Sequence, residues 1–151
     1  MNPVFAEYVG RVPDLMAELR GQPIVPIVGT TFPKAAAIYV FFLEAEPLHV
    51  GRTRNLRQRL QGHRTNSHFS ASFAFNRARA STGRVATYRK GEGRETLLAD
   101  AVFADAFAKA LAEVRGMGVQ YLVVDDPIEQ YLLELHAALE LGTSLSEFDT
   151  H

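Results

Sequence analysis

The sequence contains no cysteine, which excludes disulfide bonds, thiolate metal ligands and cysteine nucleophiles. It also lacks a long hydrophobic run. The longest uninterrupted apolar stretch, residues 35–43, is far shorter than the roughly 20 residues that a membrane helix needs. The first residues lack the basic start and the apolar centre of a signal peptide. We therefore expect a cytoplasmic protein without a membrane-spanning segment.

The length and the apolar content together bound the number of domains. With 151 residues, 47% of them hydrophobic, the chain can bury one sizeable core but is too short for two ordinary domains. We expect one domain over residues 1–151, with its core in residues 36–141.

The net charge is only -1, but the charges are distributed unevenly along the chain. Between Arg52 and Arg94 there are eleven lysines or arginines and a single acid, whereas acids predominate from Glu95 onward. Salt limits the reach of each charge to about 10 Å, so a local basic segment can hold phosphates whatever the total charge. The segment is compatible with nucleic-acid binding and also with an ordinary solvated surface.

The N-terminal part predicts a helix and then a loop. Apolar residues at three- and four-residue spacings indicate an amphipathic helix over residues 4–20, interrupted or restarted at Pro13. Three prolines, with Gly29, predict a loop over residues 21–34.

The next segments predict a β-hairpin. β-branched and aromatic residues over 36–43 favour a buried strand. Residues 44–47 make a turn, and its length favours an antiparallel partner strand over 48–51.

An arginine-rich helix is predicted after the hairpin, capped by Thr53 or Asn55. Asn55, Arg59 and His63 follow one another at four-residue intervals, which places them on one face of this helix. Three other arginines point elsewhere and have the character of solvated or phosphate-steering charges: Arg54, Arg57 and Arg64.

The following elements are a helix over 68–80, a polar loop over 81–93, a helix over 96–115 and a third strand over 119–124. The first of these helices interleaves phenylalanines with Asn76, Arg77 and Arg79. Aromatic and arginine side chains interleaved in this way can stack on nucleic-acid bases, but phenylalanines four residues apart are more typical of a core.

A final helix is predicted from its ends and its apolar pattern. Asp126 is the expected N-cap with Pro127 in the first helical position, and Gly142 follows the last residue, Leu141. Glu134 is the only glutamate of this helix that we expect to be half-buried. The predicted buried face consists of Ile128, Tyr131, Leu132, Leu135, Ala138 and Leu139.

Several of these segments together resemble the GIY-YIG nuclease family. Ala37-Ile38-Tyr39 and His49-Val50-Gly51 match its two short hairpin sequences, residues 52–63 match its arginine-bearing helix, and residues 129–134 match its glutamate-bearing helix. The chain is similar to the small stand-alone bacterial members, including the ending over residues 148–151.

The resemblance implies an α+β fold with a small three-stranded antiparallel sheet flanked by helices. An N-terminal helix and a helix before the third strand would be additions to it. It also implies a divalent-metal-dependent phosphodiesterase that acts on DNA. Its cofactor would be Mg²⁺ or Mn²⁺.

The resemblance further assigns roles to single residues. Glu134 would be the metal ligand, and Arg59 would bind the phosphate as its charge grows. Tyr39 would orient or deprotonate the attacking water, and His63 would contact the phosphate or the leaving group. With His49 these form the expected catalytic set. The expected substrate-binding set is Arg52, Arg54, Arg57, Arg64 and Arg77.

His49 stands where the family usually has its second tyrosine. An imidazole, with an ordinary pKa of about 6.5, is a better base at neutral pH than a phenol. The alternative is that His49 is a hydrogen-bonded structural histidine, in a domain that binds nucleic acid without cutting it. Ala37 replaces the family's leading glycine, and Ser146 lies near the position of a frequent asparagine. RNA as a substrate, a homodimer, and a protein-interaction domain using the acidic half all stay open.

Overall fold

The computed structural model describes residues 1–64, 72–83, 100–143 and 145. It divides into two compact units, one formed by residues 1–57 and 117–151 and the other by residues 58–116, and each is described by itself. No helix in the described stretches is both long and apolar enough to cross a membrane. The single domain expected from the sequence stays a prediction.

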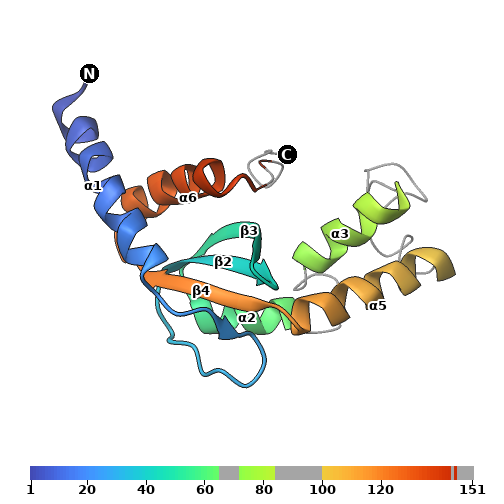
Figure 1. Cartoon of the computed structure of the whole chain (residues 1–151). Helices are drawn as coiled ribbons and strands as arrows, with labels where there is room; N and C mark the ends of the chain where they lie inside the picture. Colours follow the sequence, from blue (N-terminus) through green and yellow to red (C-terminus); the bar gives the residue numbers. More distant parts are fainter. Residues whose placement is uncertain (65–71, 84–99, 144, 146–151) are drawn as a thin grey trace. The chain divides into compact units, whose positions relative to one another are not determined.

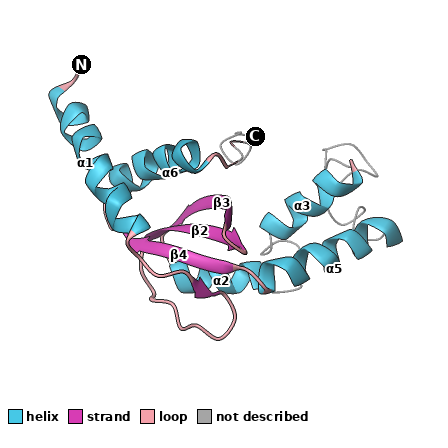
Figure 2. Ribbon diagram, in the orientation of Figure 1, coloured by secondary structure: helices cyan, strands magenta, loops and turns pink. Residues whose placement is uncertain are grey.

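The first unit is an antiparallel sheet with helices, which confirms the α+β class (Figures 1 and 2). Its described part contains four strands in the order β1-β4-β2-β3 rather than the predicted three. The extra strand β1 lies in the segment predicted as a loop, where Val25 pairs with Val119. The elements are α1 (Pro3–Arg20), β1 (Val25–Pro26), β2 (Ala37–Leu43), β3 (Glu46–Thr53), β4 (Gly118–Val123) and α6 (Pro127–Leu141).

The core lies between one face of this sheet and the two long helices. Alternate residues of β2, among them Ile38 and Val40, pack in one cluster with Leu19 of α1 and with Leu133 and Ala137 of α6. Figure 1 shows α1 and α6 together on this side. Because strand side chains alternate, Tyr39 and its odd-numbered neighbours face the opposite side of the sheet.

Helix α1 is continuous through Pro13, so the predicted interruption is wrong. A proline inside a helix removes one backbone hydrogen bond and costs about 3 kcal/mol. The burial of Val12, Met16 and Leu19 on the same helix offsets this cost.

The hairpin is tighter than the sequence predicts. Its turn contains only Glu44 and Ala45, and β3 begins at Glu46 and extends to Thr53. Glu44 has a φ of 57°, a conformation that two-residue hairpin turns commonly require. The predicted strand 36–43 is confirmed to within one residue.

Helix α6 has the predicted ends but a different buried face. Asp126 caps it through the backbone N–H groups of Ile128 and Glu129, and Gly142 takes a left-handed conformation at its end. The buried residues are Gln130, Leu133, Ala137 and Ala138, of which only Ala138 was predicted. Four predicted core residues are exposed instead: Ile128, Tyr131, Leu135 and Leu139.

This error has a physical reason. The helix is apolar on two opposite sides, so its periodicity does not decide which side packs against the sheet. The side with two alanines lies in the core, while the side with larger side chains faces solvent. Glu134 is half-buried as expected, but Glu129 is half-buried too.

The second unit consists of helices in its described residues. Helix α2 (Leu56–Arg64) begins in the first unit and continues into the second, which also contains α3 (Ser72–Thr82) and α5 (Ala101–Arg115). Asp100 caps α5, which buries Phe103, Phe107 and Leu111. The predicted helices 68–80 and 96–115 are confirmed over the described part, and residues 68–71 and 84–99 lie outside it. Ser81 and Thr82, predicted as loop, end α3.

Polar contacts fasten α1 to the start of α6. The Tyr8 hydroxyl donates to Asp126 Oδ2 at 2.9 Å, and Arg11 binds both Glu7 and Glu129. Desolvation would raise the pKa of Asp126, but hydrogen bonds from Tyr8, Ile128 and Glu129 outweigh it and hold the pKa below its usual range. The Asp126 hydrogen bond raises the pKa of Tyr8 in turn.

The lowered pKa of Asp126 predicts an acid-sensitive contribution to stability. A carboxylate whose folded pKa is depressed stabilises the fold above its unfolded pKa of about 3.9, and loses that contribution as the pH falls through the lower folded pKa. The free energy of unfolding should therefore be lower in Asp126→Asn than in the wild type at pH 6, and the difference should shrink below about pH 4. Urea unfolding of both proteins across this range measures it. A difference that is independent of pH would contradict the assignment.

Candidate functional site

The hairpin brings Tyr39 and His49 together on one face of the sheet. Tyr39 pairs with Gly51 and Phe41 pairs with His49, so the side chains of these residues share a face. The ring centroids of Tyr39 and His49 are 5.9 Å apart, and His49 lies 5.5 Å from Phe41. Tyr39 is 1% exposed and His49 is 6% exposed. The two predicted residues are thus adjacent, but both are buried.

Gly51 is required because the ring of Tyr39 lies over it. A Cβ atom on Gly51 would lie 2.5 Å from the Tyr39 hydroxyl oxygen and 2.9 Å from a ring carbon. Any side chain at position 51 would therefore displace the phenol. The Tyr39 hydroxyl consequently lies above β3, which is an edge strand of the sheet.

Arg52 and Glu134 form an ion pair beside the same edge strand. Arg52 Nε lies 3.4 Å from Glu134 Oε1, and the glutamate side chain is 13% exposed. The Arg52 guanidinium carbon also lies 3.9 Å from the centre of the Tyr131 ring. The Tyr39 hydroxyl of β2 thus lies over Gly51, and the Arg52–Glu134 pair involves the next residue of β3, whose side chain points to the opposite face of the sheet.

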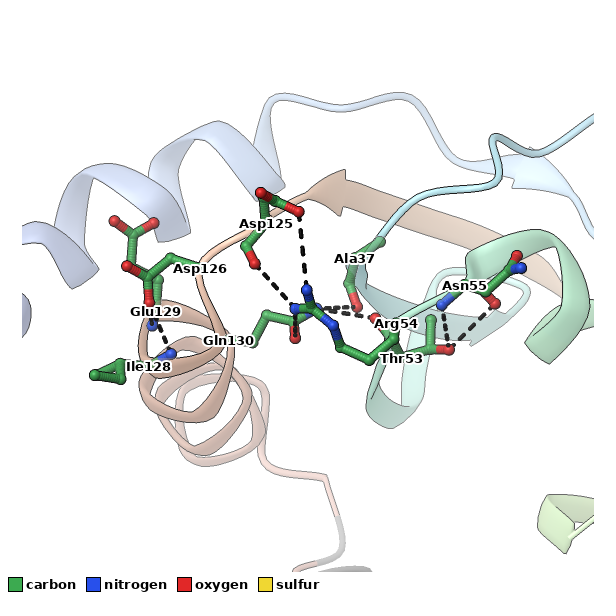
Figure 3. A network of polar contacts seen from close by, with 9 residues as sticks. All are labelled: Ala37, Thr53, Arg54, Asn55, Asp125, Asp126, Ile128, Glu129 and Gln130. Atoms are coloured by element: carbon green, nitrogen blue, oxygen red, sulfur yellow. Dashed lines mark hydrogen bonds and ion pairs between the residues drawn. The ribbon is translucent and has the colours of Figure 1, made fainter.

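Gln130 fixes the position of α6 against the hairpin (Figure 3). It is 2% exposed, and its amide Nε2 donates to the carbonyl oxygens of Ala37, at 3.3 Å, and of Thr53, at 2.9 Å. Its Oε1 accepts from Arg54 Nη1 at 3.1 Å. The start of β2, the end of β3 and the first turns of α6 are thereby joined through one amide, one helical turn before Glu134.

Arg54 and Arg57 bind groups within the chain rather than pointing freely into solvent. Arg54 Nη1 also donates to the carbonyl of Asp125 at 2.9 Å, as drawn in Figure 3. Arg57 Nε donates to the carbonyl of Phe32 at 2.7 Å. Both residues therefore have structural roles, and their predicted contacts with a substrate stay predictions.

The other predicted basic residues belong to the second unit. Arg59 is half-buried in α2. His63 and Arg64 lie on the same helix, and their side chains are outside the described part of the structure. Arg77 of α3 donates to Glu113 of α5 at 2.6 Å. Ser146 and residues 148–151 are also outside the described part.

The described residues include no group of three or more His, Asp and Glu side chains suited to hold a metal. Mg²⁺ differs from zinc in this respect, because it keeps several waters and often binds through one or two carboxylates together with substrate phosphates. The half-buried carboxylate of Glu134 fits such a site. Arg52 already pairs with this carboxylate and would compete with the ion for it.

Two residues of this region were not recognised as functional from the sequence. Gln130 falls within the segment 129–134 of the family resemblance without a role of its own, and the apolar pattern predicts Tyr131 in the core. The available signal for Gln130 was its position four residues before Glu134, which places both on neighbouring turns of one face. No sequence signal marks Tyr131 as exposed, because its exposure depends on which face of α6 packs against the sheet.

Comparison of the chain with protein-family models, with curated proteins and with solved structures finds no match.

The Gln130 network predicts a specific loss of stability. Gln130→Met keeps the volume of the side chain but leaves the Arg54 guanidinium and the carbonyl oxygens of Ala37 and Thr53 without this partner. The free energy of unfolding should fall by about 1–3 kcal/mol. Urea unfolding measures the change, with the exposed Gln61→Met of α2 as a matched control that should stay within about 0.5 kcal/mol of wild type. Equal effects of the two substitutions would show that the network is not a constraint on the fold.

Proposed function

We propose that the chain is a divalent-metal-dependent DNA endonuclease of the GIY-YIG type. The proposal depends above all on the Arg52–Glu134 pair, in which a half-buried carboxylate is held beside the hairpin that carries Tyr39 and His49. Those residues are far apart in sequence. The ion pair lies on the α6 face of β3 and the two rings lie on the other face. In this proposal the carboxylate, the guanidinium and the two ring groups act together on a phosphate bound along the outer edge of this strand.

The residues suit phosphodiester hydrolysis. A bound Mg²⁺ or Mn²⁺ would offset charge on the phosphate oxygens and lower the pKa of a water. Glu134 would hold the ion, and Arg52, released from the carboxylate, would bind the phosphate. The Tyr39 hydroxyl, above Gly51, would orient the attacking water, with His49 next to it as the general base.

The family resemblance adds Arg59 and His63 of α2 as groups that contact the phosphate or the leaving group. Arg59, which stays charged at any relevant pH, suits a transition state in which negative charge accumulates. The three-stranded core of that fold would correspond to β2, β3 and β4, with β1 as an addition.

The burial of Tyr39 and His49 favours a second candidate function. Groups that act on a water must reach it, and both rings are almost fully buried. A domain that binds nucleic acid without cutting it would keep the hairpin and the basic segment while using the two rings only for packing. This alternative predicts salt-sensitive binding without turnover.

Conversion of supercoiled plasmid to nicked plasmid in Mg²⁺ or Mn²⁺ tests the proposal. The wild type should nick, and Glu134→Gln should be slower by about 100-fold or more, because a metal contributes several kcal/mol to the transition state. Arg59→Met should also be slower. Glu140→Gln is the matched control, since Glu140 is an exposed glutamate of the same helix that pairs with Arg20.

Two results would overturn the proposal. Nicking that is unchanged in Glu134→Gln would place the metal elsewhere or indicate a contaminant. Salt-sensitive DNA binding without nicking at any pH would establish the second candidate instead.

A further inference from the structure

An exposed apolar stripe follows one side of α6. It consists of Ile128, Tyr131, Leu135 and Leu139, which are 45–61% exposed. These residues lie opposite the buried face and are spaced three or four residues apart, so they form a continuous line along the helix. Tyr131 is the only aromatic residue of the stripe.

Arg52 holds the Tyr131 ring from one side. Its guanidinium carbon lies 3.9 Å from the ring centroid, and its Nε is also 3.4 Å from Glu134. A cation over an aromatic face restricts the orientation of the ring. Tyr131 nevertheless remains 57% exposed. The ring is thus held in place by Arg52 while much of its surface is open to solvent.

This arrangement suits a nucleotide better than a purely apolar partner. A nucleobase stacks on an exposed aromatic ring, and an arginine beside the ring is complementary to the charge of the adjoining phosphate. Tyr131 precedes Glu134 by three residues, so the two side chains are neighbours on the helix. A base on the Tyr131 ring would therefore lie next to a phosphate at Glu134.

We infer that Tyr131 and Arg52 form a stacking platform for one unpaired nucleobase of a DNA strand, beside the bond that is cut. The inference rests on the proposed function and narrows its substrate. In an intact duplex both faces of each base are covered by its neighbours, and exposing one costs a few kcal/mol. The platform therefore selects DNA with an unpaired nucleotide at the cleavage position.

Binding of an oligonucleotide that contains 2-aminopurine tests the platform, because the emission of this base changes when it stacks. The measurement is made in EDTA, so that cleavage does not interfere. Single-stranded DNA should change its emission on binding to the wild type and to Tyr131→Phe, which keeps the ring. Tyr131→Ala should abolish the change and weaken binding about 5- to 150-fold. Binding to a fully paired duplex should be equal in all three proteins.

Leu139→Ala is the matched control, because Leu139 is an equally exposed member of the stripe two turns further along α6. It should bind and change the emission as the wild type does. Single-strand affinity and emission that are the same in Tyr131→Ala and the wild type would overturn the platform and leave the nuclease proposal intact. Absence of DNA binding by the wild type would overturn both.

A different result would assign the stripe to a second copy of this chain. In that case Tyr131→Ala and Leu139→Ala would both lower the sedimentation mass of the protein and neither would alter the affinity for single-stranded DNA. That outcome also overturns the platform.

Discussion

The buried amide of Gln130 is the interaction on which the candidate site depends. It joins the carbonyl oxygens of Ala37 and Thr53, which lie at the two open ends of the hairpin, and accepts a hydrogen bond from Arg54. The orientation of the amide is determined by these partners, since only the nitrogen can donate to carbonyls and only the oxygen can accept from a guanidinium. A polar residue is stable in this core because all of its hydrogen-bonding groups are used. Without it, α6 would pack on the sheet through apolar contacts and the half-exposed Arg52–Glu134 pair, which constrain its rotation and register less than a buried, fully hydrogen-bonded amide does.

The position of Glu134 follows from this constraint. Gln130 holds α6 one turn earlier, and Arg52 reaches the carboxylate from β3. On the other face of the same strand, Gly51 leaves room for the Tyr39 ring. The edge strand thus carries a phenol on one side and an ion pair on the other. Each of these two neighbouring residues therefore has a role in the fold itself: Gly51 makes room for the Tyr39 ring, and Arg52 pairs with Glu134.

Local signals in the sequence predicted the ends of α6 and the first strand of the hairpin well. Asp126 and Gly142 specify the ends of α6 through short-range hydrogen bonding and backbone conformation, and the β-branched and aromatic residues of 36–43 specify β2. The two-residue turn and the pairing of Tyr39 with Gly51 were not predicted. Three features depended on distant contacts and could not be predicted in this way. The buried face of α6 is selected by the sheet, β1 exists only because β4 pairs with it, and Pro13 is accommodated because α1 is held in the core.

The same distinction between local signals and distant contacts applies to the candidate site. The proximity of Tyr39 and His49 was predictable from the hairpin, and the burial of Tyr39 from its place in a buried strand, whereas the burial of His49 was not. The Arg52–Glu134 pair joins residues from the two separate sequence segments that make up the first unit. The hydrogen bonds of Arg54 and Arg57 likewise depend on backbone carbonyls that come close only in the folded chain. A sequence shows that these arginines are charged but does not show which group each one binds.

Titration of the purified protein with Mn²⁺, followed by the electron paramagnetic resonance signal of the free ion, tests the central claim that Glu134 at this edge is a metal ligand. The account predicts that the wild type removes Mn²⁺ from solution and that Glu134→Gln does not. Arg52→Met should bind the ion more tightly than the wild type, because it frees the carboxylate. Equal Mn²⁺ binding by the wild type and Glu134→Gln would contradict the account.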